Sequence, residues 1–478
     1  MMIASHLLTR TGDKMWEFAL PLILSSLAPD LFAAALFGLV TYGVRVIFGT
    51  WIGRKIDDTN RLKVISLGIG LQAVSVGCSA TAIWFLLRLS ANNPDFHFFM
   101  TPVSSSIFVA LLLSGSVGSL AAMAMDIAIE RDWVPTLITE DEHLTVMNAR
   151  MRQADLVTEV GGPLVGGFLL LLGNQIGFMI IAGWNFLTFL PQYLLLVAVY
   201  YDFPILHKKA APPAEEEGGV IATFCSPFYS LFRGWRLFTQ QPIVLVTFSF
   251  TMLWLTILSP HDPVFTAYLM FAGYPDWELG IFRAIGAVAG VIAAFLFPAI
   301  ARGLGLQKSM LFFIFEEGVM VAAAGVTLWL NLHGYAPEVM RYLFLVFVVL
   351  SRPGLYGFEV GEIQVMQQGV PENIRGSVSS VESSLTALAA LIFFIPPIFV
   401  SNPQDFVYLI WASIGCINVG SLLFAIWSMR WDLSNREHKH GGTKYDLHNY
   451  LHSAAQQGIL EEQAEIHAHL HFVRRGCC

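Results

Sequence analysis

The middle of the chain, residues 208–219, reads KKAAPPAEEEGG. A charged run that is rich in proline and glycine is typical of a flexible linker. Each side of it holds six apolar runs of about the 20 residues that a membrane helix needs. The runs lie at 7–28, 31–53, 62–88, 104–129, 154–172 and 176–200 before the linker, and at 243–270, 278–300, 309–330, 342–366, 377–399 and 405–429 after it. The sequence therefore predicts an all-α membrane protein with twelve transmembrane helices in two six-helix halves.

This reading divides the chain into four parts. The N-terminal half occupies 1–203, the cytoplasmic linker 204–240, the C-terminal half 241–431 and a hydrophilic tail 432–478. The tail holds seven of the 13 histidines, a composition that favours metal capture. A merely solvated tail is the alternative.

The composition excludes several classes of protein. Apolar residues make up 55% of the chain, charged residues only 13%, and the mean hydropathy is +0.62. A soluble domain carries about 25% charged residues. The predicted loops are shorter than the roughly 50 residues of the smallest domains, so we expect no enzyme. With a net charge of −8 and no basic domain, the expected partner is the lipid bilayer and not nucleic acid.

Lysine and arginine predict the orientation, because they favour cytoplasmic loops. They recur in alternate connections, at 54–63, 131–152, 208–236, 302–308 and 375. The opposite connections hold only Arg341, with Arg88 at an edge. Both termini are therefore expected in the cytoplasm. We expect the plasma membrane, with an organelle membrane such as the vacuolar one as the alternative.

Two carboxylates lie at membrane depth in the first predicted span. Asp13 and Glu17 are spaced i, i+4 and share one helical face with Thr9. A charge in a bilayer costs about 2.5–3.5 kcal/mol, so such a pair marks a functional site. A cation between the two carboxylates would relieve their repulsion. The alternative is that Lys14 and water satisfy both at the cytoplasmic end.

The seventh predicted span contains the sequence SPHDP at 259–263. Each proline removes a backbone donor and clashes with the carbonyl four residues earlier, so the helix should break here. Irregular backbone at membrane depth is tolerated where it lines a cavity. His261 and Asp262 offer nitrogen and oxygen ligands for half of a divalent-metal site. A proline kink without a ligand is the alternative.

Further polar residues lie within the spans. Three arginines, Arg45, Arg283 and Arg352, are predicted to neutralise carboxylates such as Glu359 and Glu362.

Residues 9–19, TRTGDKMWEFA, resemble the first helix of the ferroportins, which are cellular iron exporters. The likeness continues in the right order over residues 5–430. Its other segments are 60–64, 130–133, 147–149, Arg152, Asp155, 183–185, 233–235, 240–242, Arg352, 354–355, 375–376 and 402–403. The resemblance implies a major-facilitator-like fold, whose two halves also match the layout predicted above.

In the family, each half holds a metal site. The resemblance implies that the first site uses Asp13 with contributions from Thr9 and Asn185. Glu17 stands where animal members have histidine. Asp262 aligns with a cysteine of their second site, and Phe393 with its histidine. Because that cysteine binds the hormone hepcidin in vertebrates, we do not expect hepcidin regulation here.

The resemblance also implies a cytoplasmic gate that closes when the protein faces outward. Its residues are Asp57, Arg61, Asp132, Asn148, Arg152, Asp155 and Arg375.

We therefore predict a monomeric transporter, without a cofactor, that exports iron(II) from the cytosol by alternating access. Protons are expected to exchange for the metal, because the ligands must deprotonate to bind it. The carboxylate ligands also suit manganese, cobalt or nickel. A transporter of an organic cation or metal chelate, and a non-transporting receptor or scaffold, are the alternatives.

Overall fold

The structure is a computed structural model that describes residues 1–27, 32–92, 98, 99, 101–208, 220–259, 265, 268, 269, 272–274, 276–394 and 406–439. The elements in this part of the chain are helical. In the first half they are α1 (Met2–Leu27), α2 (Phe32–Asp58), α3 (Arg61–Ala91), α4 (Pro102–Asp126), the π-helix η1 (Ile127–Trp133), α5 (Val134–Leu137), α6 (Asp141–Leu170) and α7 (Asn174–Asp202).

The remaining elements belong to the linker and the second half. They are η2 (Pro204–His207), α8 (Val220–Thr239), α9 (Val244–Trp254), α11 (Asp276–Leu304), α12 (Leu306–Leu332), α13 (Pro337–Leu350), α14 (Arg352–Gly369), η3 (Glu372–Ile374), α15 (Arg375–Phe394) and α17 (Phe406–Lys439). Of the predicted tail, only the part up to Lys439 is among the described residues.

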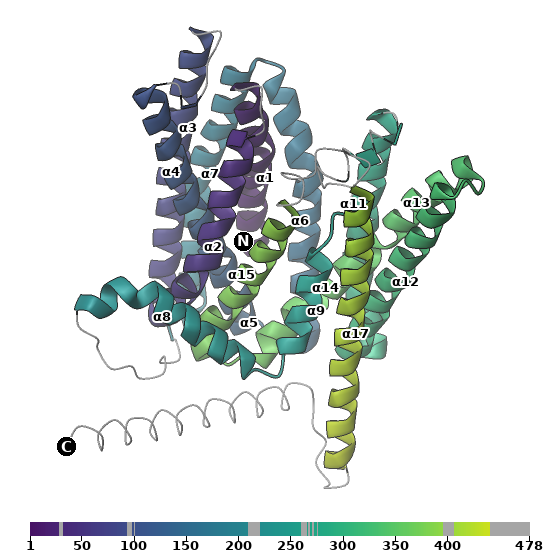
Figure 1. Cartoon of the computed structure of the whole chain (residues 1–478). Helices are drawn as coiled ribbons and strands as arrows, with labels where there is room; N and C mark the ends of the chain where they lie inside the picture. The colour runs from purple at the N-terminus through teal and green to yellow at the C-terminus, as the bar shows by residue number, and fades with distance from the viewer. Residues whose placement is uncertain are drawn as a thin grey trace, which may run out of the picture.

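The predicted all-α membrane fold is confirmed, although the count of twelve spans is not. Eight helices of the described residues are long and apolar enough to cross a membrane, or nine if one bent pair counts as a single span. Helix α1 falls outside this set because Arg10, Asp13, Lys14 and Glu17 make it too polar. These charges do not face lipid alone, since α1 packs against α6 and α7 (Figure 1).

The two halves meet along two helix pairs, α2 with α15 and α6 with α11 (Figure 1). Each pair joins the second predicted span of one half to the fifth of the other, as expected for halves related by an axis along the membrane normal. The apolar core of the second half extends into α6, where it includes Ala149 and Leu156. Helix α6 is therefore shared between the two halves.

Two glycines allow α2 and α15 to approach closely. A Cβ atom at Gly53 would lie 2.3 Å from the Gly376 carbonyl oxygen and 2.3 Å from Ser380 Oγ. A Cβ atom at Gly49 would lie 2.5 Å from Ser384 Oγ. These glycines form a small-xxx-small pattern that lets helix backbones come into contact.

We expect Gly53→Ala to destabilise the contact between the halves by about 1–3 kcal/mol, the usual cost of overpacking. The measurement is the thermal unfolding of the purified protein in detergent. Gly43→Ala on the same helix is the matched control, because a Cβ atom there meets nothing within 4 Å. Equal melting temperatures for both variants would contradict this account of the α2–α15 contact.

The predicted linker, 204–240, includes two described helical elements, η2 and α8. Residues 209–219 lie outside the described part, but α8 is a helix that packs against α2 and α15 (Figure 1). Its Leu237 and Phe238 are buried, and the chain turns by 111° between α8 and α9. The charged, proline-rich composition of residues 208–219 therefore says nothing about α8, which follows them and is more apolar.

The predicted break in the seventh span is confirmed and begins earlier than the prolines themselves. Helix α9 ends at Trp254. The freed backbone N–H of Ile257 donates to Ser413 Oγ at 3.0 Å, and that of Leu258 donates to Thr256 Oγ1 at 2.9 Å. A proline at position 260 of the sequence disfavours a helix that continues past Thr256, because its ring would clash with the carbonyl of that residue. His261 and Asp262 lie outside the described residues.

Candidate functional site

The candidate site lies along one polar face of α1. His6, Arg10, Asp13 and Glu17 follow the spacing i, i+4, i+7 and i+11, which keeps side chains on one side of a helix. The half-buried Asp13 carboxylate makes no hydrogen bond or salt bridge with any other described residue. Glu17 pairs instead with Lys14, at 2.9 Å, and its side chain is 61% exposed. The two predicted ligands therefore differ in their contacts, since Glu17 is paired with Lys14 and Asp13 has no such salt bridge among the described residues.

Asn185 holds α7 against α1 beside Asp13. Its buried amide donates to the carbonyl oxygens of Gly12 and Ile181, each at 3.1 Å. A Cβ atom at Gly12 would lie 2.4 Å from Asn185 Oδ1, so the contact needs glycine there. The Thr9 hydroxyl, one turn before Asp13, donates to the Ser5 carbonyl at 3.0 Å and keeps its lone pairs. These oxygens and the free carboxylate fit the ligand preferences of a divalent cation.

Two predicted gate residues join the halves at the end of α2 and the start of α3. Asp57 accepts hydrogen bonds from the backbone N–H groups of Gly376 and Ser377, at 2.7 and 2.8 Å, and so caps α15 from the other half. Arg61 binds Asp132 of its own half in a bidentate pair at 2.9 and 2.7 Å. It also binds Glu372 of the second half at 2.5 Å.

Helix α6 makes a second set of contacts across the halves, to α14. Arg152 forms a salt bridge with Glu359 at 2.9 Å. Asn148 donates to Gln367 Oε1 at 2.7 Å, and both side chains are buried.

A further buried pairing across the halves involves an arginine that was not among the predicted site residues. Arg131 of η1 lies 2.5 Å from Glu382 and 3.4 Å from Glu362. The side chains of these three residues are 11%, 5% and 1% exposed. In the sequence, only the position of Arg131 between two acids, in the segment ERDW at 130–133, pointed to a role in an ion-pair network.

The predicted partners of Glu359 and Glu362 were therefore wrong. Arg152 and Arg131 neutralise these carboxylates. Arg45 donates to Ser119 Oγ at 2.7 Å within its own half. Arg352 donates to the Val348 carbonyl and to Ser351 Oγ. The helix positions alone did not reveal which arginine reaches which carboxylate.

Two further predicted gate residues, Asp155 and Arg375, form their hydrogen bonds and salt bridges within their own half in the described part of the chain. Asp155 binds His6 at 2.7 Å and Arg10 at 3.0 Å, and Arg152 approaches it at 3.9 Å. Arg375 donates to the Val370 carbonyl of its own half at 3.2 Å. Asp155 thus faces the interior of the first half.

Three consecutive charged residues of the π-helix η1 pair with three different elements of the fold. Glu130 binds Arg10 of α1 at 3.2 Å, Arg131 binds the second half, and Asp132 binds Arg61 of α3. Short π-helical turns occur frequently at functional sites. Here the turn links the polar face of α1 to the contacts between the halves.

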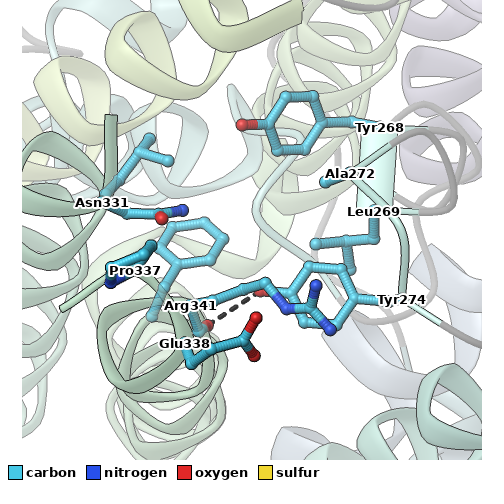
Figure 2. A pocket seen from close by; sticks show the side chains of 10 residues that line it. Tyr268, Leu269, Ala272, Tyr274, Asn331, Pro337, Glu338 and Arg341 are labelled. Atoms are coloured by element: carbon cyan, nitrogen blue, oxygen red, sulfur yellow. Dashed lines mark hydrogen bonds between the residues drawn. The ribbon is translucent and has the colours of Figure 1, made fainter. Parts of the chain in front are cut away.

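A separate cavity of about 230 Å³ lies in the second half, where α12 ends and α13 begins (Figure 2). Its lining includes Tyr268, Tyr274, Asn331, Glu338 and Arg341. The Arg341 guanidinium lies 4.4 Å from the centre of the Tyr274 ring, and the Tyr274 hydroxyl donates to the Arg341 carbonyl. None of the predicted site residues is among those that line this cavity.

Comparison with known families gives a match over residues 1–417 to the family described as Ferroportin1 (FPN1). The chain is 32% identical to a protein named Ferreportin from Bdellovibrio bacteriovorus, over 90% of this chain and 94% of that one. It is 28% identical to solute carrier family 40 member 2 of Arabidopsis thaliana, over 88% of each chain.

Solved structures of a bacterial homologue of the iron transporter ferroportin match in two states. The outward-facing state gives a TM-score of 0.78 at 32% identity, over 90% of this chain and 98% of that one. The inward-facing state gives 0.59 at 30% identity, over 89% and 97%. A major facilitator proton:xylose symporter shares the fold alone, with a TM-score of 0.62 at 14% identity over 90% and 94%.

Proposed function

This chain belongs to the ferroportin family of membrane transporters, and we propose from this premise that it exports iron(II) from the cytosol. The observation that carries the proposal is the Asp13 carboxylate, which makes no hydrogen bond or salt bridge with a described residue and lies beside the Gly12–Asn185 contact. Manganese, cobalt and nickel remain alternative substrates because oxygen ligands accept all of them.

We also propose that transport proceeds by alternating access and that the structure represents the state closed to the cytoplasm. The contacts of Asp57, Arg61, Arg131 and Arg152 with the second half lie at the end that the positive charges assign to the cytoplasm. The closer match to the outward-facing homologue, 0.78 against 0.59, supports the same state. Opening of the protein to the cytoplasm would require these pairs to separate together. The substrate must therefore bind the open state more tightly than the closed state, by enough to compensate for the lost pairs.

The remaining features of the proposal rest on the sequence. They are cytoplasmic termini, a monomer in the plasma or an organelle membrane, the boundaries at 203, 240 and 431, and proton exchange for metal. The second-half site at His261 and Asp262 also stays a prediction, with no hepcidin regulation.

The test is metal flux through the purified full-length chain in liposomes, with a fluorescent chelator on one side. Iron(II), manganese, cobalt and nickel are supplied separately, and flux is measured with and without a pH gradient. We expect saturable iron(II) flux that competing organic cations do not inhibit. Absence of flux with every metal would instead support a receptor or scaffold, and inhibition by organic amines would support an organic-cation transporter.

A further inference from the structure

Three side chains of the first half come together near the start of α1, on the N-terminal side of Asp13. His6 of α1, Glu130 of η1 and Asp155 of α6 each offer a ligand atom, and these atoms lie within 4.8 Å of one another. The His6 side chain is 6% exposed, so its nitrogen is held in place by packing. One imidazole nitrogen and two carboxylate oxygens form a ligand set that suits iron(II), manganese, cobalt or zinc.

The charges around this group are not balanced. Asp126 joins Glu130 and Asp155 around Arg10, whose guanidinium lies 3.0 Å from Asp126, 3.2 Å from Glu130 and 3.0 Å from Asp155. Arg152, at 3.9 Å from Asp155, is neutralised by Glu359 at 2.9 Å. With His6 neutral, the largely buried carboxylates of Glu130 and Asp155 and the Arg10 guanidinium leave one negative charge, and the Asp126 side chain, which is 40% exposed, adds a second. A divalent cation bound among these carboxylates would balance both charges.

The position of the group relates it to both Asp13 and the contacts between the halves. His6 precedes Asp13 by seven residues, which is two helical turns or about 10 Å along α1. Arg10 lies between them, one turn from each. The backbone carbonyl of Glu130 accepts a hydrogen bond from Gln367 of the second half at 2.6 Å. Movement of the second half therefore changes the surroundings of Glu130.

We propose that His6, Glu130 and Asp155 form a loading site for a divalent cation on the cytoplasmic side of Asp13. Arg10 is a tethered cation that occupies this site while the cytoplasmic side is closed, and an incoming metal displaces it. The role in loading rests on the proposed function, export from the cytosol. The existence of a metal site at His6, Glu130 and Asp155 does not depend on the direction of transport. The proposal assigns Asp155 to metal loading in addition to its predicted place in the gate.

The test measures Co²⁺ binding to the purified full-length chain by equilibrium dialysis and visible absorption. All variants of the main series carry Asp13→Ala, so that the Asp13 site does not contribute. Adding Arg10→Gln should increase the affinity of one Co²⁺ equivalent by about tenfold, because a competing positive charge is removed. Adding His6→Ala to this pair should abolish the gain. His143→Ala is the matched control, since His143 is exposed and pairs only locally with Glu140 at 2.9 Å.

Equal Co²⁺ binding with and without Arg10→Gln would overturn the proposal, as would an equal loss from His143→Ala and His6→Ala. If Arg10→Gln does not fold, the chain with only Asp13→Ala is titrated with millimolar Co²⁺ and compared with its His6→Ala derivative. Persistence of every weak Co²⁺ equivalent in that derivative would also overturn the proposal. Failure of the transport proposal is seen separately, as absence of metal flux through the unmodified chain.

Discussion

Asp13→Asn is expected to reduce iron(II) flux by at least about tenfold, with normal expression and folding. An amide oxygen replaces the anionic ligand, and even the loss of an outer-shell partner of a metal ligand typically costs about 10–100-fold in affinity or activity. The shape of the side chain is retained, so the Gly12–Asn185 contact beside it should persist. The measurement is initial flux in liposomes that contain equal amounts of each variant.

Glu17→Gln is the matched control for Asp13→Asn. Glu17 lies on the same face of α1, but it is exposed and already paired with Lys14. Loss of the Glu17 charge should lower iron(II) flux much less than Asp13→Asn does. Equal effects of the two substitutions would show that the negative charge of the α1 face matters and that Asp13 has no special role as a ligand.

If the structure is the proposed state closed to the cytoplasm, Arg131→Met should open it at the end where Arg131 joins the two halves. Removing one partner of a buried ion pair costs about 3–5 kcal/mol, because the other charges are left uncompensated. Here Glu362 and Glu382 would both lose Arg131. At about 1.4 kcal/mol per factor of ten, the closed population should fall at least about a hundredfold relative to the open one.

The measurement is the distance between spin labels at Glu142→Cys and Arg302→Cys in a background without native cysteines. Glu142 and Arg302 are exposed and lie 3.5 Å apart across the two halves. The distance should lengthen in Arg131→Met and recover when Glu362→Gln and Glu382→Gln are added. Arg45→Met, which removes an arginine bonded within the first half, should leave the distance unchanged. An unchanged distance in Arg131→Met would exclude Arg131 from the gate.

The general fold was predictable because it depends on features that are local in sequence. Long apolar runs, a polar break at 208–219 and prolines at 260 and 263 require no knowledge of distant partners. The span count was less certain, since α1 carries charges that only its neighbours in the fold accommodate. Helix α8 was not predicted, because the prediction of a flexible linker rested on the charged run at 208–219 that precedes it.

The site was predictable only where a motif carried it. Asp13 was predicted from its charge at membrane depth as well as from resemblance, whereas Asn185 and Arg61 were assigned to the site and the gate by resemblance. The structure adds the contacts of Asn185 and Arg61, which residue spacing could not give. His6 lies seven residues before Asp13, so extension of the same helical face would have revealed it. Arg131 was not identifiable in this way, because its partners lie more than 200 residues away and a π-helix changes the periodicity.

The polarity of α1 has a consequence for how the protein is made. Each of its four charges costs about 2.5–3.5 kcal/mol at the centre of a bilayer on insertion scales, so α1 is a poor membrane segment by itself. Its packing partners α6 and α7 are synthesised more than 100 residues later. Helix α1 must therefore wait for α6 and α7 before it inserts stably. Biogenesis of the N-terminal half should be a cooperative, late event, and chains truncated before α6 should retain α1 at the membrane surface.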